Sequence, residues 1–98
     1  MDRKDVYAII DSERDYQETE WPRSTALPVP GEVILMEDYI RQFKQEYQKD
    51  DDAPNESAPL AALHTLRKIV AIGVRALENV HLDKSDLIRK KYRGGSAM

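Results

Sequence analysis

The sequence predicts an all-α protein, and three observations support this fold class. Apolar residues recur at intervals of three and four along three long stretches, which places their side chains on one face of a helix. Prolines gather at the ends of these stretches or between them. No segment alternates apolar and polar residues over the length of a strand. We therefore expect a small bundle of three or four helices, built on a long antiparallel helical hairpin.

The chain has 98 residues, which is the size of one domain. We assign residues 1–93 to a single helical domain and expect residues 94–98 to form a disordered tail. With one Phe, one Trp and five Tyr, the core has to be built mainly from aliphatic side chains. A small bundle of this composition often gains core by association. We therefore expect a homo-oligomer.

Composition excludes several classes of protein. The chain has no cysteine, which excludes disulfides, thiolate metal sites and cysteine nucleophiles. Charge begins at residue 2, unlike a secretory signal, and no apolar run reaches the roughly 18–20 residues of a membrane span. The net charge of −3 gives no general attraction to nucleic acid. We expect a cytoplasmic protein with neither a membrane nor a long nucleic acid as partner.

The first helix is predicted over residues 3–20. One face carries apolar residues that give way to polar ones: Val6, Ile9, Ile10, Glu13 and Gln17. Either the second half of this helix leaves the core, or it lines a polar pocket. The helix is expected to end at Trp21, because a residue that precedes proline is disfavoured in the α conformation. The prolines of residues 22–31 then predict a stiff connection.

The second helix is predicted over residues 31–49. Glu32 lies in its first turn, where an acid interacts favourably with the helix dipole. Its apolar face is wide and consists of Val33, Ile34, Leu35, Met36, Ile40, Phe43 and Tyr47. Residues 49–57, with three consecutive aspartates, are expected to form a solvent loop.

The third helix is predicted over residues 58–79, with Ser57 as the N-cap and Pro59 in the first turn. A long stripe is formed by Leu60, Leu63, Leu66, Val70, Gly73, Val74 and Leu77. Small residues on the same helix would let a neighbouring helix approach closely: Ala61, Ala62, Ala71, Gly73 and Ala76. A short fourth helix is expected within residues 83–92, capped by Asp83 or Ser85.

The end of the first helix is the strongest candidate for a functional site. Within residues 14–22 it combines a base, three acids, an amide, a phenol and the only tryptophan. A helix that only packs has little need of this mixture. We expect Arg14, Tyr16, Gln17 and Trp21 to form one wall of a ligand site, with Trp21, Tyr16 or Tyr39 stacking on a base.

The third helix supplies candidate anion contacts. Arg67 and Lys68 interrupt a strongly apolar segment, and His64 precedes them by one turn. They can extend over the edge of the core towards solvent. Alternatively, Arg67 and Lys68 bind phosphate, the first with a forked contact and the second as a point charge, with His64 in support.

Carboxylates give a second reading of the site, in which the cofactor is Mg²⁺. Oxygen ligands from facing helices, together with substrate phosphates, can hold this ion. The acids at suitable spacings are Asp11, Asp15, Glu18, Glu37 and Asp38. They are equally consistent with solvated helix faces. The leading reading assigns no metal, no other cofactor and no catalytic residue.

Several of these segments resemble small phage-encoded proteins called MazG-like, which are similar to all-α nucleoside triphosphate pyrophosphohydrolases. The resemblance covers residues 3–80 through four motifs: Glu13-Arg14-Asp15-Tyr16-Gln17 with Trp21, the helix from Glu32 to Tyr47 with Glu37-Asp38-Tyr39, Leu66 to Ala71, and Ala76-Leu77-Glu78. It implies an oligomeric helical bundle that holds magnesium between acids and nucleotide phosphates. The family's catalytic pattern is E-x-x-E on one helix and E-x-x-D on the next.

The chain departs from this pattern. Asp38 is followed at the third position by Arg41, and the counterpart on the third helix is His64-Thr65-Leu66-Arg67, with bases where acids belong. We therefore expect a phage-type binding protein that holds a nucleotide or a nucleotide-derived, for example cyclic, signal without hydrolysis. Sequestration of a host defence messenger in the host cytoplasm is a plausible use by analogy. The alternatives are a magnesium-dependent nucleotide pyrophosphohydrolase and a protein-interaction module.

Overall fold

The computed structural model describes residues 1–22, 27–48 and 59–89. Within these ranges it is all-helical, and three long helices pack together: α1 (Arg3–Glu20), α2 (Val29–Gln48) and α3 (Leu60–Glu78). A short helix, α4 (Lys84–Leu87), follows. The predicted all-α class is confirmed. The predicted 49–57 loop, the Ser57 cap and the 94–98 tail lie outside the described residues.

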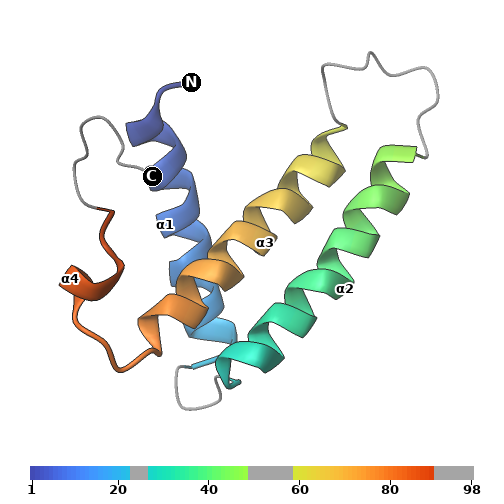
Figure 1. Ribbon diagram of the computed structural model, residues 1–98. Helices are drawn as coiled ribbons and strands as arrows, with labels where there is room; N and C mark the ends of the chain where they lie inside the picture. The colour runs from blue at the N-terminus through green and yellow to red at the C-terminus, as the bar shows by residue number, and fades with distance from the viewer. Residues whose placement is uncertain (23–26, 49–58, 90–98) are drawn as a thin grey trace, which may run out of the picture.

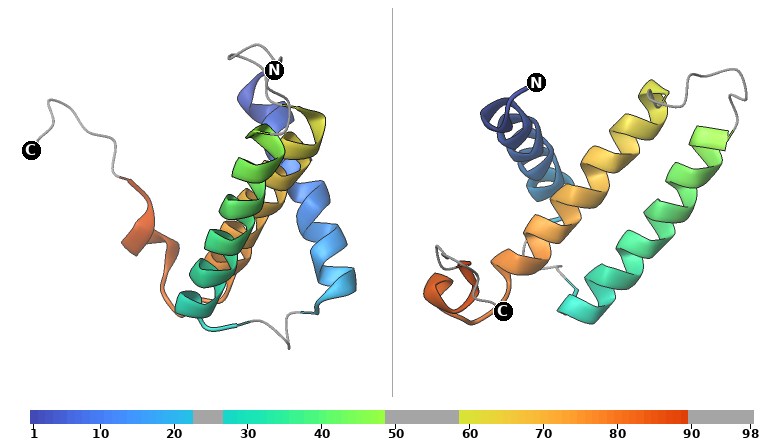
Figure 2. Two further views of the ribbon diagram at one scale, coloured as in Figure 1. Left: turned by 90° about the vertical axis from the view of Figure 1, so that its right-hand side faces the viewer. Right: turned by 45° about the horizontal axis from the view of Figure 1, so that its top comes forward.

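Helix α3 is the central element, because both α1 and α2 pack against it. Helices α2 and α3 lie side by side and run in opposite directions, while α1 crosses α3 at an angle (Figures 1 and 2). Asp2 caps α1 by accepting a hydrogen bond of 2.9 Å from the backbone N–H of Asp5. None of the helices in the described ranges is long and apolar enough to cross a membrane.

The core of this arrangement is small. Among the described residues, the buried apolar ones all belong to α3: Ala62, Ile69, Ala71, Ile72 and Ala76. Three of the small residues that were predicted to allow close helix approach are among them, whereas Ala61 is exposed. At Gly73, a Cβ atom would lie 3.4 Å from the terminal methyl group of Met36 in α2. The α2–α3 contact is therefore tight but buries little apolar side-chain volume.

The predicted apolar stripes were expected to face the core, and much of them is exposed. On α1, Val6 and Ile9 are exposed and the buried residues are Glu13, Arg14 and Gln17. On α2, Val33, Ile34 and Ile40 are exposed. The stripe on α3 is exposed at Leu60, Leu63, Leu66, Val70 and Leu77. Within the described ranges, one copy of the chain therefore buries the polar half of α1 and leaves the leucines of α3 exposed.

Candidate functional site

A pocket of about 240 Å³ lies where α1, α2 and α3 meet. Its lining combines two aromatic rings, three aliphatic side chains and four polar or charged ones: Gln17, Trp21, Leu27, Glu32, Leu35, Tyr39, Lys68, Ile72 and Arg75. A larger hollow of about 400 Å³ lies on the outer surface of α2 and is lined by polar residues of that helix alone. Only the first of these two joins several elements around aromatic and buried polar groups.

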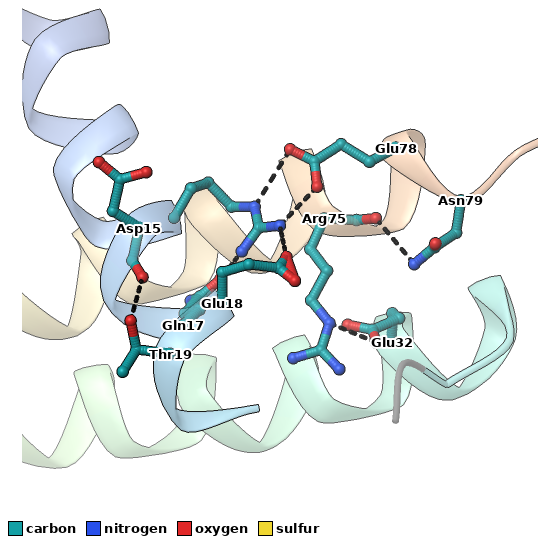
Figure 3. Close-up of polar contacts among 9 residues, drawn as sticks. Asp15, Gln17, Glu18, Thr19, Glu32, Arg75, Glu78 and Asn79 are labelled. Atoms are coloured by element: carbon teal, nitrogen blue, oxygen red, sulfur yellow. Dashed lines mark hydrogen bonds and ion pairs between the residues drawn. The ribbon is translucent and has the colours of Figure 1, made fainter. Parts of the chain in front are cut away.

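The end of α1 is held against α3 by Arg14. Its guanidinium donates to both carboxylate oxygens of Glu78, from Nη2 at 2.5 Å and from Nε at 3.3 Å, and Nη2 also donates to Glu18 at 3.0 Å. Figure 3 shows Glu78 and Glu18 converging on this group. The hydrogen bond with Glu78 raises the pKa of Arg14, and burial opposes this by lowering it. The result is a charged fork that fixes α1 over α3.

Gln17 lies one turn further along α1 and is 1% exposed. Its amide oxygen accepts a hydrogen bond of 3.3 Å from Nη1 of Arg14. That contact determines the orientation of the amide, because a flipped amide would place its NH₂ group against the guanidinium. The Nε2 atom is buried and has no hydrogen-bond partner among the described residues.

Glu32 and Arg75 form the opposite side of the pocket. Glu32 is fully buried in the first turn of α2, and its Oε1 accepts a hydrogen bond of 3.0 Å from the backbone N–H of Leu27. Nε of Arg75 lies 3.4 Å from the same oxygen (Figure 3). This is an ion pair without hydrogen-bond alignment. Within the described chain, Glu32 Oε2 and Arg75 Nε therefore have no hydrogen-bond partner, although Arg75 Nε takes part in the ion pair.

Three buried polar atoms around one pocket thus lack partners: an amide nitrogen, a carboxylate oxygen and a guanidinium nitrogen. Each such atom costs about 1–3 kcal/mol when buried and unpaired. Native proteins leave few such atoms without a hydrogen bond, so each of the three calls for an explanation. Two of the atoms are donors and one is an acceptor.

Aromatic and cationic groups complete the walls. The ring of Tyr16 stands edge-on to that of Trp21, with centroids 6.5 Å apart. Nζ of Lys68 lies 4.9 Å from the centroid of the Tyr39 ring, which is cation–π geometry. Trp21 and Tyr39 line the same pocket from different elements.

The eight predicted ligand-binding residues fall into three groups. Gln17, Trp21, Tyr39 and Lys68 line the pocket. Arg14 and Tyr16 are outside the lining and contact lining residues, namely Gln17 and Trp21. The last two are placed elsewhere: Arg67 donates from Nε to the buried carboxylate of Glu13 at 2.8 Å, and His64 is exposed.

Sequence reasoning missed Glu32 and Arg75, and with them Leu27, Leu35 and Ile72. The position of Glu32 in the first turn of α2 suits the helix dipole, but its carboxylate also accepts a hydrogen bond from the backbone N–H of Leu27. Arg75 follows Lys68 by seven residues, so the two lie on the same face of α3. That spacing was the available signal for Arg75.

The acids of the magnesium reading are spread over two helices. Asp11 and Asp15 are exposed on α1, and Glu18 binds Arg14. On α2, Glu37 is exposed and Asp38 lies 3.3 Å from Nη1 of Arg41. The described ranges contain no group of three or more His, Asp or Glu side chains placed to hold a metal ion.

Comparison of the chain with protein-family models, with curated proteins and with solved structures finds no match. The candidate site therefore depends on its own geometry.

Proposed function

We propose that the protein binds a nucleotide or a nucleotide-derived signal in the pocket between α1, α2 and α3, and holds it without hydrolysis. The observation that supports this is the cluster of three unpartnered buried polar atoms beside Trp21 and Tyr39. Heteroaromatic bases combine a flat face for stacking with an edge of donors and acceptors. The resemblance to MazG-like proteins points to the same ligand class.

The lack of hydrolysis is proposed from the residue types. On α3, His64 and Arg67 stand where the catalytic pattern of the resembled family has acids. On α2, Arg41 likewise stands where that pattern has an acid. The carboxylate within the pocket, Glu32, is engaged by the N–H of Leu27 and by Arg75. It is suited to recognition of a ligand. For a phage-encoded protein, such binding would sequester a host messenger.

We also propose that the binding protein is a homo-oligomer. The exposed apolar residues of α2 and α3 recur at intervals of three, four and seven, so that each helix presents an uncovered stripe: Val29, Val33 and Ile40 on α2, and Leu63, Leu66, Val70 and Leu77 on α3. Large exposed apolar patches in a soluble protein commonly mark interaction sites. A second copy of the chain would cover these stripes.

Binding and hydrolysis are separated by a mixing experiment. Purified protein is incubated with linear and cyclic nucleotides, with and without magnesium, and removed by filtration; the retained protein is then heated. We expect one nucleotide to leave the filtrate and to return unchanged on heating. Magnesium-dependent conversion to monophosphate and pyrophosphate would show the enzyme. If every nucleotide stays free and intact, the proposal fails and an interaction module becomes the reading to pursue.

A matched pair of aromatic substitutions locates the binding site. Stacking on an aromatic side chain contributes about 1–3 kcal/mol per base, so Trp21→Ala should weaken binding about 5- to 150-fold. The control is Tyr7→Ala, because Tyr7 is an exposed aromatic residue of α1 outside the pocket. Equal affinities of the two variants would place the ligand elsewhere.

A further inference from the structure

We infer that the base of the ligand enters the pocket and donates an N–H to Glu32, while the phosphate stays outside beside Lys68. This inference rests on the proposed function and assigns the two parts of the ligand to separate places. The enzymes that this chain resembles hold their nucleotides through magnesium between acids and the phosphates. The arrangement inferred here instead makes the base the deeply bound part.

The unpartnered atoms set the hydrogen-bonding character of the ligand. Gln17 Nε2 and Arg75 Nε are donors, whereas Glu32 Oε2 is an acceptor. A phosphate has acceptor oxygens only, so it would leave Glu32 Oε2 unpaired and place two negative charges together. The edge of a nucleobase offers an N–H donor next to acceptors. The groups on such an edge are of the types that these three atoms can pair with.

Charge leads to the same assignment. Glu32 and Arg75 form an ion pair, and Gln17 is neutral, so these three buried side chains together carry no net charge. Among the described lining residues, Lys68 is the cation that does not form an ion pair with a lining acid. It is half-buried over the Tyr39 ring. An anionic group is therefore attracted to Lys68, whereas the net charge of the buried side chains does not attract it.

The size of the pocket agrees with partial burial of the ligand. Pockets that enclose a whole drug-sized ligand are usually about 300–1,000 Å³. The volume here is about 240 Å³, with Trp21, Leu35 and Ile72 in the walls. A base fits such a space, and a complete nucleotide extends beyond it.

The principal test varies the ligand and leaves the protein intact. Calorimetric titrations compare, on the wild-type protein, a nucleoside, its 5′-phosphate, inorganic pyrophosphate, and the same nucleoside methylated until its base retains no N–H donor. Each of the four common bases is tested. We expect the nucleoside to bind and pyrophosphate not to compete with it. Methylation should weaken binding about tenfold or more, the effect of losing a hydrogen bond to a charged group.

Substitutions test the position of the phosphate. Lys68→Gln should remove most of the affinity that the 5′-phosphate adds and so lower the ratio of nucleotide to nucleoside affinity, since a lone lysine acts as a point charge on phosphate. The control Lys44→Gln, at an exposed lysine of α2 outside this pocket, should change neither affinity. Circular dichroism of both variants verifies that they are folded.

The outcomes separate the inference from the proposed function. If nucleotides bind but pyrophosphate competes equally, or if methylation leaves affinity unchanged, the inference is wrong while nucleotide binding stands. The same conclusion follows if Lys68→Gln weakens nucleoside and nucleotide alike. If the wild-type protein binds neither nucleosides nor nucleotides, the proposed function fails and the inference fails with it.

Discussion

At the scale of single residues, two arginines that were predicted to contact the ligand form ion pairs with acids of the same chain. Arg14 contacts Glu78 and Glu18, and Arg67 contacts Glu13. Glu13 is 5% exposed, so its charge depends on a partner. A buried carboxylate without a cation is strongly unfavourable. These arginines hold α1 on α3, and Arg14 also orients the amide of Gln17.

We predict that Arg67→Ala destabilises the fold and spares the pocket. The change removes the Nε donor, 2.8 Å from the carboxylate of Glu13. Loss of a hydrogen bond to a charged group should lower the free energy of unfolding by about 1.5–3 kcal/mol. Urea denaturation measures this. The nucleotide affinity of the folded protein should change less than about twofold, because Arg67 lies outside the pocket lining. A large loss of affinity would instead support a phosphate contact by Arg67.

The control for this prediction is Arg41→Ala. Arg41 pairs with Asp38 on α2 in a contact whose two side chains are 70% and 61% exposed. Exposed ion pairs contribute about 0–1 kcal/mol. A loss at Arg41 as large as that at Arg67 would contradict the assigned role of the buried Glu13.

At the scale of the helices, α1 shows what periodicity can and cannot predict. Its bounds are those predicted, and those of α2 and α3 differ from the prediction by no more than two residues at either end. Spacing and proline positions determine such limits locally. Which face of α1 is buried depends on Glu78, 64 residues further along the chain from Arg14. That pairing has no local signal. The predicted face contained Val6 and Ile9 as well as Glu13 and Gln17, and only the two polar residues of these four are buried.

We predict that Glu78→Gln loosens the second half of α1. Arg14 loses the carboxylate that accepts two of its hydrogen bonds. Since Glu78 is partly exposed, with a side chain at 31%, we expect a local loss near 1 kcal/mol and not the effect of a fully buried pair. This corresponds to about fivefold faster amide exchange over the last two turns of α1.

The exchange experiment has an internal and an external control. Amides in the middle of α2 should keep their wild-type rates in the Glu78→Gln variant. Glu20→Gln removes an exposed acid from α1 itself and should leave the exchange of the helix unchanged. Faster exchange throughout the molecule would indicate global destabilisation instead.

Helix α4 supplies a prediction of pH dependence. Asp83 caps it, and its carboxylate accepts a hydrogen bond from Ser85 Oγ. This hydrogen bond lowers the pKa of Asp83 below its ordinary value of 3.8. A carboxyl whose pKa is lowered on folding stabilises the structure above its unfolded-state pKa, and this contribution is lost as the pH falls through the lowered value. We therefore expect α4 to fray only in acid, below pH 3.8.

The measurement is an NMR titration of the Asp83 carboxyl carbon together with the amides of α4. Both should move with one midpoint below 3.8. Ser85→Ala should shift that midpoint upwards, because the hydroxyl donor is the largest cause of the lowered pKa. An unchanged midpoint in this variant would show that Ser85 does not lower the pKa of Asp83.

At the scale of the whole molecule, the exposed stripes explain why the sequence suggested a larger core than one copy provides. The periodic leucines of α3 look like core residues, yet the helix packs through its alanines, Ile69 and Ile72. Within the part of the chain that the structure describes, α1 and α2 leave one face of α3 exposed. The sequence therefore predicted helices and their small-residue contact, whereas the identity of the inward face depended on long-range packing.

The last prediction concerns association through these stripes. Leu66 and Val70 lie next to each other on the exposed face of α3, 44% and 42% exposed in one copy. If a second copy covers them, Leu66→Glu places a charge in an apolar interface and should produce monomers in analytical ultracentrifugation. Ile34→Glu is the matched control: Ile34 is 60% exposed, but at about 100° per residue it lies away from the face formed by Val33 and Ile40. Association lost equally in both variants would reflect general destabilisation, and a wild-type protein that is monomeric at all concentrations would refute the oligomer. The apolar face is then open to a different protein, because burial of such surface stabilises a complex by about 25 cal/mol per Å² whichever chain supplies it.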